Sequence, residues 1–521
     1  MPSIKSNLSL SELKQSLIND LDNRVADRIL EPANRDLLKK LINNAENKTE
    51  AISIAELGTT YKRTGFHFDK KLEKQTDTIK YFKKNNELSF VTDENRLTHK
   101  LIIGDNYDAL LNLSISYKGK IDVIYIDPPY GKDDLGDFAQ TNYDNAITRD
   151  NLLSMLYPRL VLAKELLSDD GVIFCSIDDK NQAYVKCLFD EVFGEQNFEG
   201  NIHWRRRHNQ PNDKNKLIAI VAEHILCYSK DRIRHKEFGV GKLDKLTGKF
   251  SNPDADKRGD WSTKAWKTGT GQSGTRYSIT TPSGKVFNEE WMGDENTYNS
   301  LLADNRIYFP NNGEGFPRKK YFKSERKKEG QCATNWWRHE DFGSNQEATT
   351  ELKSIFSTAQ IFENPKPTKL LKAIVFLGSI KDDAIVLDFF AGSGTTGQAV
   401  LELNKDDGGN RTFILCTNNE VTKSNPNGIA YDVTSKRLKR VMTGECYDGS
   451  KDFKWNKDHQ PLGDNLDVYE IEQVSNINQT PGECAFDVID ETLYGIDKLE
   501  PKEKIRFVCE NFSVTQKTIE E

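Results

Sequence analysis

The 521-residue chain lacks the features of an exported or membrane-bound protein. No apolar run reaches the roughly 18 residues that a membrane-spanning helix needs, and the segment after Met1 has no apolar signal core. The eight cysteines are scattered without a CxxC pair, which argues against a zinc ribbon or a disulfide framework. We therefore expect a cytoplasmic protein without membrane contact and without a metal site.

Acidic residues outnumber basic ones in the whole chain but not in its middle. The net charge is −7, whereas residues 201–340 hold 27 lysines and arginines against 17 acidic residues, and residues 441–521 hold 8 against 18. A basic stretch of this kind is typical of a surface that contacts nucleic-acid phosphates. An ordinary solvated surface would have the same composition, so charge alone leaves both interpretations open.

Short apolar runs alternate with helical patterns in two parts of the chain, which predicts an α/β fold with a mostly parallel sheet. Residues 236–355 differ, because their apolar residues are sparse and irregular, and we expect them to form an inserted, loop-rich domain. Buried strands are predicted over residues 121–126, 171–177, 384–388 and 412–416, and helices over 152–167 and 367–377.

These changes of pattern predict five regions. In the N-terminal region, a capping box of Ser9 and Glu12 precedes an amphipathic stripe, and together they indicate a helix. The expected role of this helix is packing or dimerisation. The stripe consists of Leu10, Leu13, Leu17 and Leu21. The regions are an N-terminal helical region (1–98), the two halves of one α/β domain (99–235 and 356–440), the inserted domain (236–355) and an acidic C-terminal region (441–521).

The first candidate site is Asp127-Pro-Pro-Tyr130, directly after the strand predicted over 121–126. Ligands bind past the carboxyl ends of strands in open α/β sheets. A carboxylate and a backbone carbonyl that accept the two N–H bonds of an aromatic amine would draw its nitrogen towards tetrahedral geometry. Because proline fixes φ, the carbonyl of Pro128 can point at a substrate, and Tyr130 can stack on an extruded base. A tight turn with an exposed aromatic ring is the structural alternative.

The second candidate site is Asp388-Phe-Phe-Ala-Gly-Ser-Gly-Thr-Thr396, between a strand and a helix. Gly392 and Gly394 would let the backbone approach a ligand closely, and the helix N-terminus offers N–H groups. The pattern is neither GxGxxG nor a GK[ST] loop, and no lysine is present to hold a triphosphate. A cofactor with a carboxylate and a sulfonium, such as S-adenosyl-L-methionine, fits better than a nucleotide. A structural glycine turn is the alternative.

Together the two sites resemble the β-class amino-methyltransferases of DNA, in which the catalytic motif precedes the cofactor motif. Two further segments, Phe362-Glu-Asn-Pro-Lys-Pro367 and His99–Leu110, are similar to other parts of that family, and the resemblance covers about 99–230 and 356–420. It implies a Rossmann-like S-adenosylmethionine-dependent methyltransferase fold in permuted motif order. Residues 99–235 would be its catalytic half, 356–440 its cofactor-binding half and 236–355 a target-recognition domain.

The resemblance also implies a role for each matching residue. The catalytic set would be Asp127, Pro128, Pro129 and Tyr130. The cofactor-binding set would be Asp105 (adenine amino group), Glu420 (ribose hydroxyls), Asn364 and Lys366 (over the cofactor), and Asp388, Phe390, Gly392, Gly394 and Thr395 around the methionine part. Two segments depart from the family pattern: Thr417-Asn-Asn-Glu420 is less apolar, and Gly-Lys-Asp-Asp follows Tyr130 where relatives have Asn-Thr-Gly.

An aspartate at 127 favours the N6 amine of adenine as the target, because relatives that modify the N4 amine of cytosine usually carry serine there. Cytosine remains the alternative, and either base must be extruded from the duplex. Arginines and lysines of the insertion would hold phosphates or read guanine edges. The candidate DNA contacts are Arg205, Arg206, Arg207, Arg258, Arg276, Lys319, Lys320 and Arg326. Core packing is expected for most of the tryptophans at 261, 266, 291, 336 and 337.

The expected function is therefore site-specific methylation of adenine in double-stranded DNA. The motif spacing and the segment His99–Leu110 are most similar to modification subunits of type III restriction systems. That likeness implies a homodimer and a separate restriction (translocase-nuclease) subunit, since this chain has no helicase or nuclease pattern. A stand-alone or type II methyltransferase is the rival. An RNA or protein-glutamine methyltransferase and a catalytically silent DNA-binding subunit are further alternatives.

Overall fold

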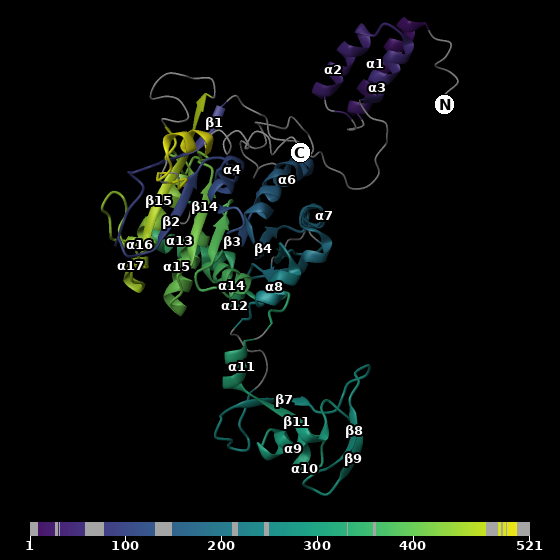
Figure 1. The fold of residues 1–521 in the computed structure, drawn as a ribbon, viewed down its shortest axis with the longest axis vertical. Helices are drawn as coiled ribbons and strands as arrows, with labels where there is room; N and C mark the ends of the chain where they lie inside the picture. Colours follow the sequence, from purple (N-terminus) through teal and green to yellow (C-terminus); the bar gives the residue numbers. More distant parts are fainter. Residues whose placement is uncertain are drawn as a thin grey trace. The chain divides into compact units, whose positions relative to one another are not determined.

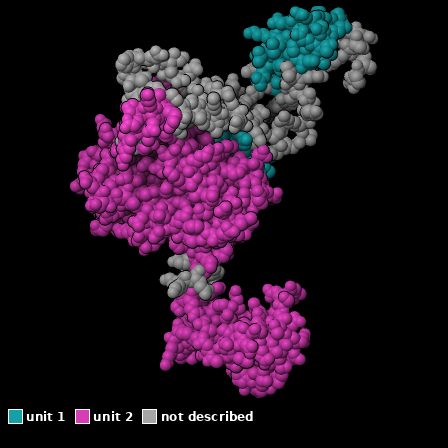
Figure 2. Space-filling model, in the orientation of Figure 1, with its two compact units in different colours: residues 1–75, 129–159, 183–188 teal, residues 76–128, 160–182, 189–521 magenta. Residues whose placement is uncertain are grey.

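The chain divides into two compact units in a computed structural model, whose elements are labelled in Figure 1. Unit 1 holds residues 1–75, 129–159 and 183–188, and unit 2 holds the remainder (Figure 2). The structure describes residues 9–26, 30, 32–57, 78–130, 148–210, 217–243, 250–330, 332–357, 361–475, 488–490, 493–495 and 497–507.

Three helices form the N-terminal part of unit 1: α1 (Leu10–Ala26), α2 (Pro32–Asn44) and α3 (Lys48–Leu57). The predicted capping box is present, because the Ser9 N–H donates to Glu12 Oε2 at 2.8 Å and the Glu12 N–H donates to Ser9 Oγ at 3.3 Å. Leu13, Leu17 and Leu21 are buried against leucine, isoleucine and alanine side chains of the other two helices. The predicted amphipathic stripe is therefore the face that holds these helices together.

A ten-stranded sheet forms the centre of unit 2 (Figure 1). Its order is β1 (Thr78–Lys84), β15 (Asn465–Ser475), β2 (Thr98–Ile103), β14 (Thr412–Thr417), β13 (Ile385–Asp388), β3 (Ile121–Ile126), β4 (Leu167–Ile177), β6 (Ala222–Ser229), β5 (Phe198–Arg205) and β12 (Trp336–Trp337). The six strands from β15 to β4 run parallel, whereas β1 and β6 are antiparallel to their neighbours β15 and β4. The α/β fold class predicted from the alternating pattern is confirmed.

Further helices belong to this part of the chain, and those between residues 345 and 458 contribute buried apolar side chains to the core that they form with the strands. The helix predicted over 152–167 is α6 (Thr148–Leu166), which contains Pro158. The helices are α4 (Asn106–Tyr117), α6 (Thr148–Leu166), α7 (Gln182–Phe193), α8 (Arg232–Phe238), α12 (His339–Phe342), α13 (Asn345–Phe356), α14 (Thr368–Gly378), α15 (Thr395–Asp407), α16 (Lys436–Thr443) and α17 (Trp455–Asp458), with a 3-10 turn η2 (Glu195–Asn197) and a π-helix η3 (Ala430–Ser435).

The insertion has its own small sheets and its own core. One sheet is β10 (Ile307–Tyr308), β11 (Arg318–Phe322) and β7 (Trp261–Ala265), and the other is the hairpin β8 (Thr275–Thr280) and β9 (Val286–Trp291). Its helices are α9 (Glu295–Ala303), α10 (Pro310–Gly313) and α11 (Lys323–Glu329). Trp266 and Trp291 are buried in a cluster with Ile279, Tyr298 and Ile307, and core packing is thus confirmed for most of the tryptophans. Trp336 is the exception, since it is 55% exposed.

Two predicted boundaries need correction. The sequence pattern places 336–355 in the insertion, but β12 pairs with β5 in the large sheet and Trp337 is buried in the core of that sheet. The same pattern sets the acidic region after 441 apart, but β15 lies between β1 and β2. Both misassignments have one cause: sheet membership depends on long-range pairing, which composition does not encode.

Two of the predicted DNA contacts form ion pairs within the insertion. Lys320 is 1% exposed, pairs with the Asp254 carboxylate and lies over the Trp261 ring. Arg258 pairs with Asp256 at 2.8 Å and stacks on a phenylalanine ring. Side chains alternate along β11, so Lys320 faces the inside and its neighbour Lys319 the outside.

No helix among the described residues is long and apolar enough to cross a membrane.

We predict that Lys320→Ala destabilises the insertion and that Lys319→Ala does not. Removing Lys320 leaves Asp254 without its buried ammonium partner, and we expect a loss of roughly 2 kcal/mol, below the value for fully buried pairs because Asp254 is partly exposed. Hydrogen exchange of the β7 and β11 amides measures this loss. Equal protection in the two variants would contradict the structural role of Lys320.

Candidate active site

The two sequence motifs follow neighbouring strands. β13 pairs in parallel with β3, Val386 opposite Val123 and Leu387 opposite Ile124, so Asp388 and Asp127 leave the sheet at the same edge. The strand that follows β3 in the chain, β4, lies on one side of this pair, and the strand that follows β13, β14, lies on the other side. Such a reversal opens a crevice at the carboxyl ends of the strands, where ligands of α/β sheets bind.

Three charged side chains meet at the first motif, and two of them are buried. Lys366 Nζ donates to Asp127 Oδ2 at 2.6 Å and to Glu223 Oε1 at 3.4 Å. Lys366 is 9% exposed, and Glu223, on β6, is 3% exposed. Burial alone would lower the pKa of Lys366, but the two carboxylates outweigh it and raise that pKa, so the ammonium persists. The family resemblance predicts Lys366 over a cofactor; the structure places its ammonium on Asp127.

The second motif forms a tight turn between β13 and α15. Gly392 and Gly394 have φ values of +48° and +77°, in a backbone region that residues other than glycine rarely adopt. A Cβ at Gly392 would lie 3.0 Å from the Phe362 ring, and one at Gly394 would lie 3.2 Å from Thr434 Cγ2. Thr434 also donates its hydroxyl proton to the Gly392 carbonyl at 2.6 Å. The turn therefore requires glycine for its backbone conformation and for the space around it.

A buried carboxylate begins this turn. Asp388 is 2% exposed, and its carboxylate accepts from the Phe390 N–H at 3.0 Å and from the Thr396 hydroxyl. Burial raises the pKa of Asp388 to about 7, although both hydrogen bonds oppose the rise. A cation next to Asp388 would favour its ionised form, so the crevice is suited to a positively charged ligand group.

Sequence reasoning missed a buried arginine that supports the turn from below. Arg437, 1% exposed on α16, donates to Thr395 Oγ1 at 2.6 Å and to Ser393 Oγ at 3.1 Å, and it pairs with Glu351 on α13. A charged residue within the apolar face of a helix is the only signal that could have indicated it. Glu223 was also missed, because a single acid in the mostly apolar strand β6 forms no recognisable motif.

Two of the remaining predicted site residues follow strands that end at the same edge. Asp105 caps α4 at the end of β2 and accepts from the Tyr107 N–H at 2.7 Å, while the neighbouring Asn106 donates to the Phe389 carbonyl at 2.8 Å. Glu420 follows β14, is half-buried, and accepts at its carbonyl from the Ile429 N–H. Pro128 is buried, Pro129, Tyr130 and Phe390 are half-buried, and Asn364 is exposed. The loop after Tyr130 lies outside the described residues.

The remaining candidate DNA contacts fall into two groups. Arg205 ends β5 and donates to the Arg207 carbonyl at 3.2 Å; Arg206 is half-buried and Arg207 exposed. In the insertion, Arg276 is exposed on β8, and Lys319 and Arg326 lie over the Tyr321 ring at 5.4 and 5.3 Å. Lys264 approaches the same ring at 5.7 Å and is the cross-strand partner of Lys319. We call Lys264, Lys319, Tyr321 and Arg326 the basic face.

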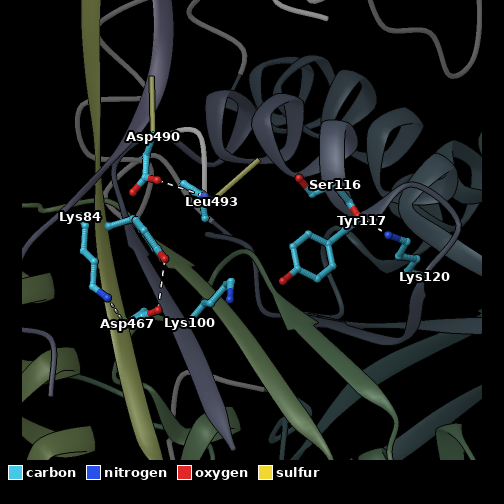
Figure 3. A pocket seen from close by; sticks show the side chains of 9 residues that line it. Lys84, Lys100, Ser116, Tyr117, Lys120, Asp467, Asp490 and Leu493 are labelled. Atoms are coloured by element: carbon cyan, nitrogen blue, oxygen red, sulfur yellow. Dashed lines mark hydrogen bonds and ion pairs between the residues drawn. The ribbon is translucent and has the colours of Figure 1, made fainter. Parts of the chain in front are cut away.

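A cavity of about 420 Å³ lies away from these residues, at the amino ends of β2 and β15 (Figure 3). Lys84 pairs with Asp467 inside it at 2.6 Å, and the Tyr469 hydroxyl donates to Asp467 at 3.2 Å. Because the motifs occupy the carboxyl ends of the strands, this cavity is separate from the candidate active site.

We predict that Gly394→Ala disturbs the glycine turn and that Gly408→Ala at the other end of α15 does not. Both residues have left-handed backbones, at +77° and +75°, so both substitutions cost about 1–2 kcal/mol in strain. Only at Gly394 does the added Cβ press on Thr434, whereas nothing lies within 4 Å at Gly408. Hydrogen exchange of the amides at 391–394 should accelerate in Gly394→Ala alone. Similar exchange in both variants would show that crowding is unimportant.

Comparisons with known proteins agree with this geometry. Residues 121–430 match the family described as DNA methylase, and residues 14–123 match a family described as an uncharacterised conserved protein. The StyLTI Mod subunit, a type III restriction-modification enzyme subunit of Salmonella typhimurium, is 35% identical over 75% of this chain and 65% of its own length. The type II methyltransferase M.KpnI of Klebsiella pneumoniae is 29% identical over 74% of this chain and 97% of its own.

The chain spans less than two thirds of the length of the type III subunits that it matches. A solved DNA modification methylase of Thermus thermophilus, complexed with S-adenosyl-L-methionine, is 13% identical and superposes with a TM-score of 0.31 over 71% of this chain and 99% of that one. The predicted resemblance to type III modification subunits is confirmed by the relatives named Mod. Since the matched residues 121–430 make up more than half of the chain and include both motifs, this protein belongs to the DNA methylase family.

Proposed function

We propose that the protein transfers a methyl group from S-adenosyl-L-methionine to the N6 amine of adenine at a specific sequence in double-stranded DNA. The observation that carries this proposal is the meeting of Asp127 and the glycine turn at the edge of two paired parallel strands. Membership of the DNA methylase family supports DNA as the substrate. The geometry of the site supports the reaction, because the Asp127 carboxylate can accept a hydrogen bond from an amine and lies beside a crevice suited to a cation.

The residues around the glycine turn fit S-adenosyl-L-methionine. We assign its charged methionine part to Asp388, Phe390, Gly392, Gly394 and Thr395, because the Asp388 carboxylate suits a positive charge and the N–H groups at the start of α15 can bind a carboxylate. Asp105 and Glu420, past β2 and β14, are assigned to the adenosine part, and Asn364 to its cover. When bound, the cofactor supplies an electrophilic methyl group on a sulfonium.

The residues after β3 would prepare the amine. Asp127 accepts one N–H of the target amine and the Pro128 carbonyl the other, which localises the nitrogen lone pair for attack on the methyl carbon. Tyr130 stacks on the extruded base, which offsets part of the cost of removing it from the duplex. The reaction forms the N–C bond and breaks the S–C bond, so that the sulfonium leaves as a neutral thioether, and the nitrogen releases one proton to solvent.

DNA recognition is assigned to the basic face of the insertion. Lys264 and Lys319 stand directly opposite each other on antiparallel strands, and like charges in that position destabilise a sheet. A phosphate bound between them would remove the repulsion, and Tyr321 could stack on a base or sugar. Exposed Arg276 and the Arg205–Arg207 segment are proposed as further phosphate contacts.

The biological setting is restriction-modification. The relatives named type III Mod subunits support association with a separate restriction subunit. We propose the homodimer from the family resemblance of the sequence. A stand-alone type II methyltransferase is the second candidate, because M.KpnI is covered over 97% of its length by this chain. Methylation of cytosine at N4 is the alternative chemistry on the same site.

We predict that Asp127→Ala reduces methyl transfer at least about 100-fold, since the amine then loses its carboxylate acceptor. The measurement is transfer of tritium from labelled S-adenosyl-L-methionine to unmethylated genomic DNA, followed by nucleoside analysis. Asp169→Ala, a change at a 75% exposed carboxylate, is the control that should retain full activity. Label in 4-methylcytosine would overturn the choice of base, and wild-type protein that labels no DNA would contradict the proposed function.

We also predict that Lys319→Ala and Arg326→Ala weaken DNA binding and reduce the salt dependence of the affinity by about one ion per lost phosphate contact. Affinity is measured by fluorescence anisotropy over a range of salt concentrations. Lys285→Ala is the matched control, because Lys285 lies over Phe287 in the other sheet of the insertion. An unchanged salt slope in both test variants would remove the basic face from the DNA interface.

A further inference from the structure

The buried acid on β6 has no assigned role in the proposed reaction. Glu223 comes from a strand two positions beyond β3 in the sheet, and Lys366 from the segment before α14, yet both converge on Asp127. Placing a carboxylate and an ammonium inside a protein costs several kcal/mol for each charge, and this cost is recovered only through close pairing. One carboxylate would suffice to pair Lys366, but the structure provides two.

The second carboxylate changes the net charge of the group. Lys366 with Asp127 alone would be neutral, whereas Lys366 with Asp127 and Glu223 has a net charge of −1. A negative charge at this edge of the sheet attracts a sulfonium, and it disfavours removal of the proton from Lys366. Glu223 contacts Lys366, so any effect of this contact on Asp127 passes through the ammonium.

We propose that Glu223 is a positioning residue that holds the Lys366 ammonium on Asp127 Oδ2 and keeps the three-residue group negatively charged. This inference rests on the proposed methyl transfer. Fixing Oδ2 on Lys366 sets the orientation of the Asp127 carboxylate, and we assign Oδ1 to the target amine. Without Glu223, the ammonium has one partner fewer and the carboxylate loses its fixed orientation.

Other titratable groups around Lys366 do not replace Glu223. Tyr125 on β3 and Cys175 on β4 have pKa values raised well above normal by burial, so they stay neutral. Asp388, whose pKa burial raises to about 7, is ionised at the alkaline pH where Lys366 loses its proton in wild type and variant alike, so it does not distinguish them. Removing the Glu223 charge therefore leaves Asp127 as the main partner and lowers the pKa of Lys366, which is otherwise raised by both carboxylates. The variant must lose the Lys366 proton at a lower pH than the wild type.

The test variant is Glu223→Gln, which keeps the shape and a hydrogen-bond acceptor but removes the charge. We expect kcat for methyl transfer to DNA to fall about 10–100-fold, the usual effect of losing a positioning partner, with a smaller change in KM for DNA. The alkaline limb of the kcat profile should move to lower pH. Glu199→Gln on neighbouring β5 is the matched control, since Glu199 pairs with Arg232 away from the site. An unchanged kcat and pH profile in Glu223→Gln would overturn the inference.

A double variant shows whether Glu223 acts through Lys366. In a Lys366→Met background, Glu223→Gln should cause no further loss of kcat, because the residue that transmits its effect is gone. A second, multiplicative loss would show a separate role and overturn the inference. Unfolding midpoints of all variants are measured alongside, because a purely structural defect would lower the midpoint without shifting the pH profile.

A third readout needs neither cofactor nor activity. Acylation of the Lys366 amine, followed by mass spectrometry across a pH series, reports the pH at which the ammonium loses its proton. The profile of Glu223→Gln should lie at lower pH than that of the wild type, and identical profiles would overturn the inference. Wild-type protein that transfers no label to DNA would contradict the proposed function, but the acylation profiles would still decide the role of Glu223.

Discussion

β13 and β3 pair in parallel at the centre of the sheet, and every contact of the candidate active site depends on that pairing. Parallel neighbours end at the same edge, so two motifs that the chain separates by the whole insertion meet there. The order of the other strands extends this edge: β14 and β2 bring Glu420 and Asp105 into line beyond Asp388. A fold with the same strands in another order would carry the same motifs without a site.

The buried cations of the site pair with carboxylates that come from distant elements. Lys366 lies between Asp127 and Glu223, and Arg437 joins the glycine turn to Glu351 on the helix that follows the insertion. Each of these two cations therefore has a carboxylate partner, as the cost of desolvation requires. The result is a crevice whose carboxylates outnumber its cations, a suitable environment for a positively charged methyl donor.

In the insertion, two neighbouring lysines have different roles. Along β11, alternate side chains separate a structural lysine from a surface one: Lys320 is enclosed by Asp254 and Trp261, while Lys319 lies with Tyr321 on the basic face. Composition alone identified the basic region but could not separate these two roles, because adjacent residues of a strand point to opposite faces.

The sequence by itself determined the local features of this protein. The strands at 121–126, 384–388 and 412–416 and the turn built on Gly392 and Gly394 could be predicted, because apolar runs and positive φ angles are encoded by neighbouring residues. The tertiary structure decided what depends on long-range pairing: the place of β12 and β15 in the sheet, and the contacts of Glu223 and Lys366 with Asp127. These contacts join residues from three separate segments, and no pattern within any one segment specifies which strands will lie side by side.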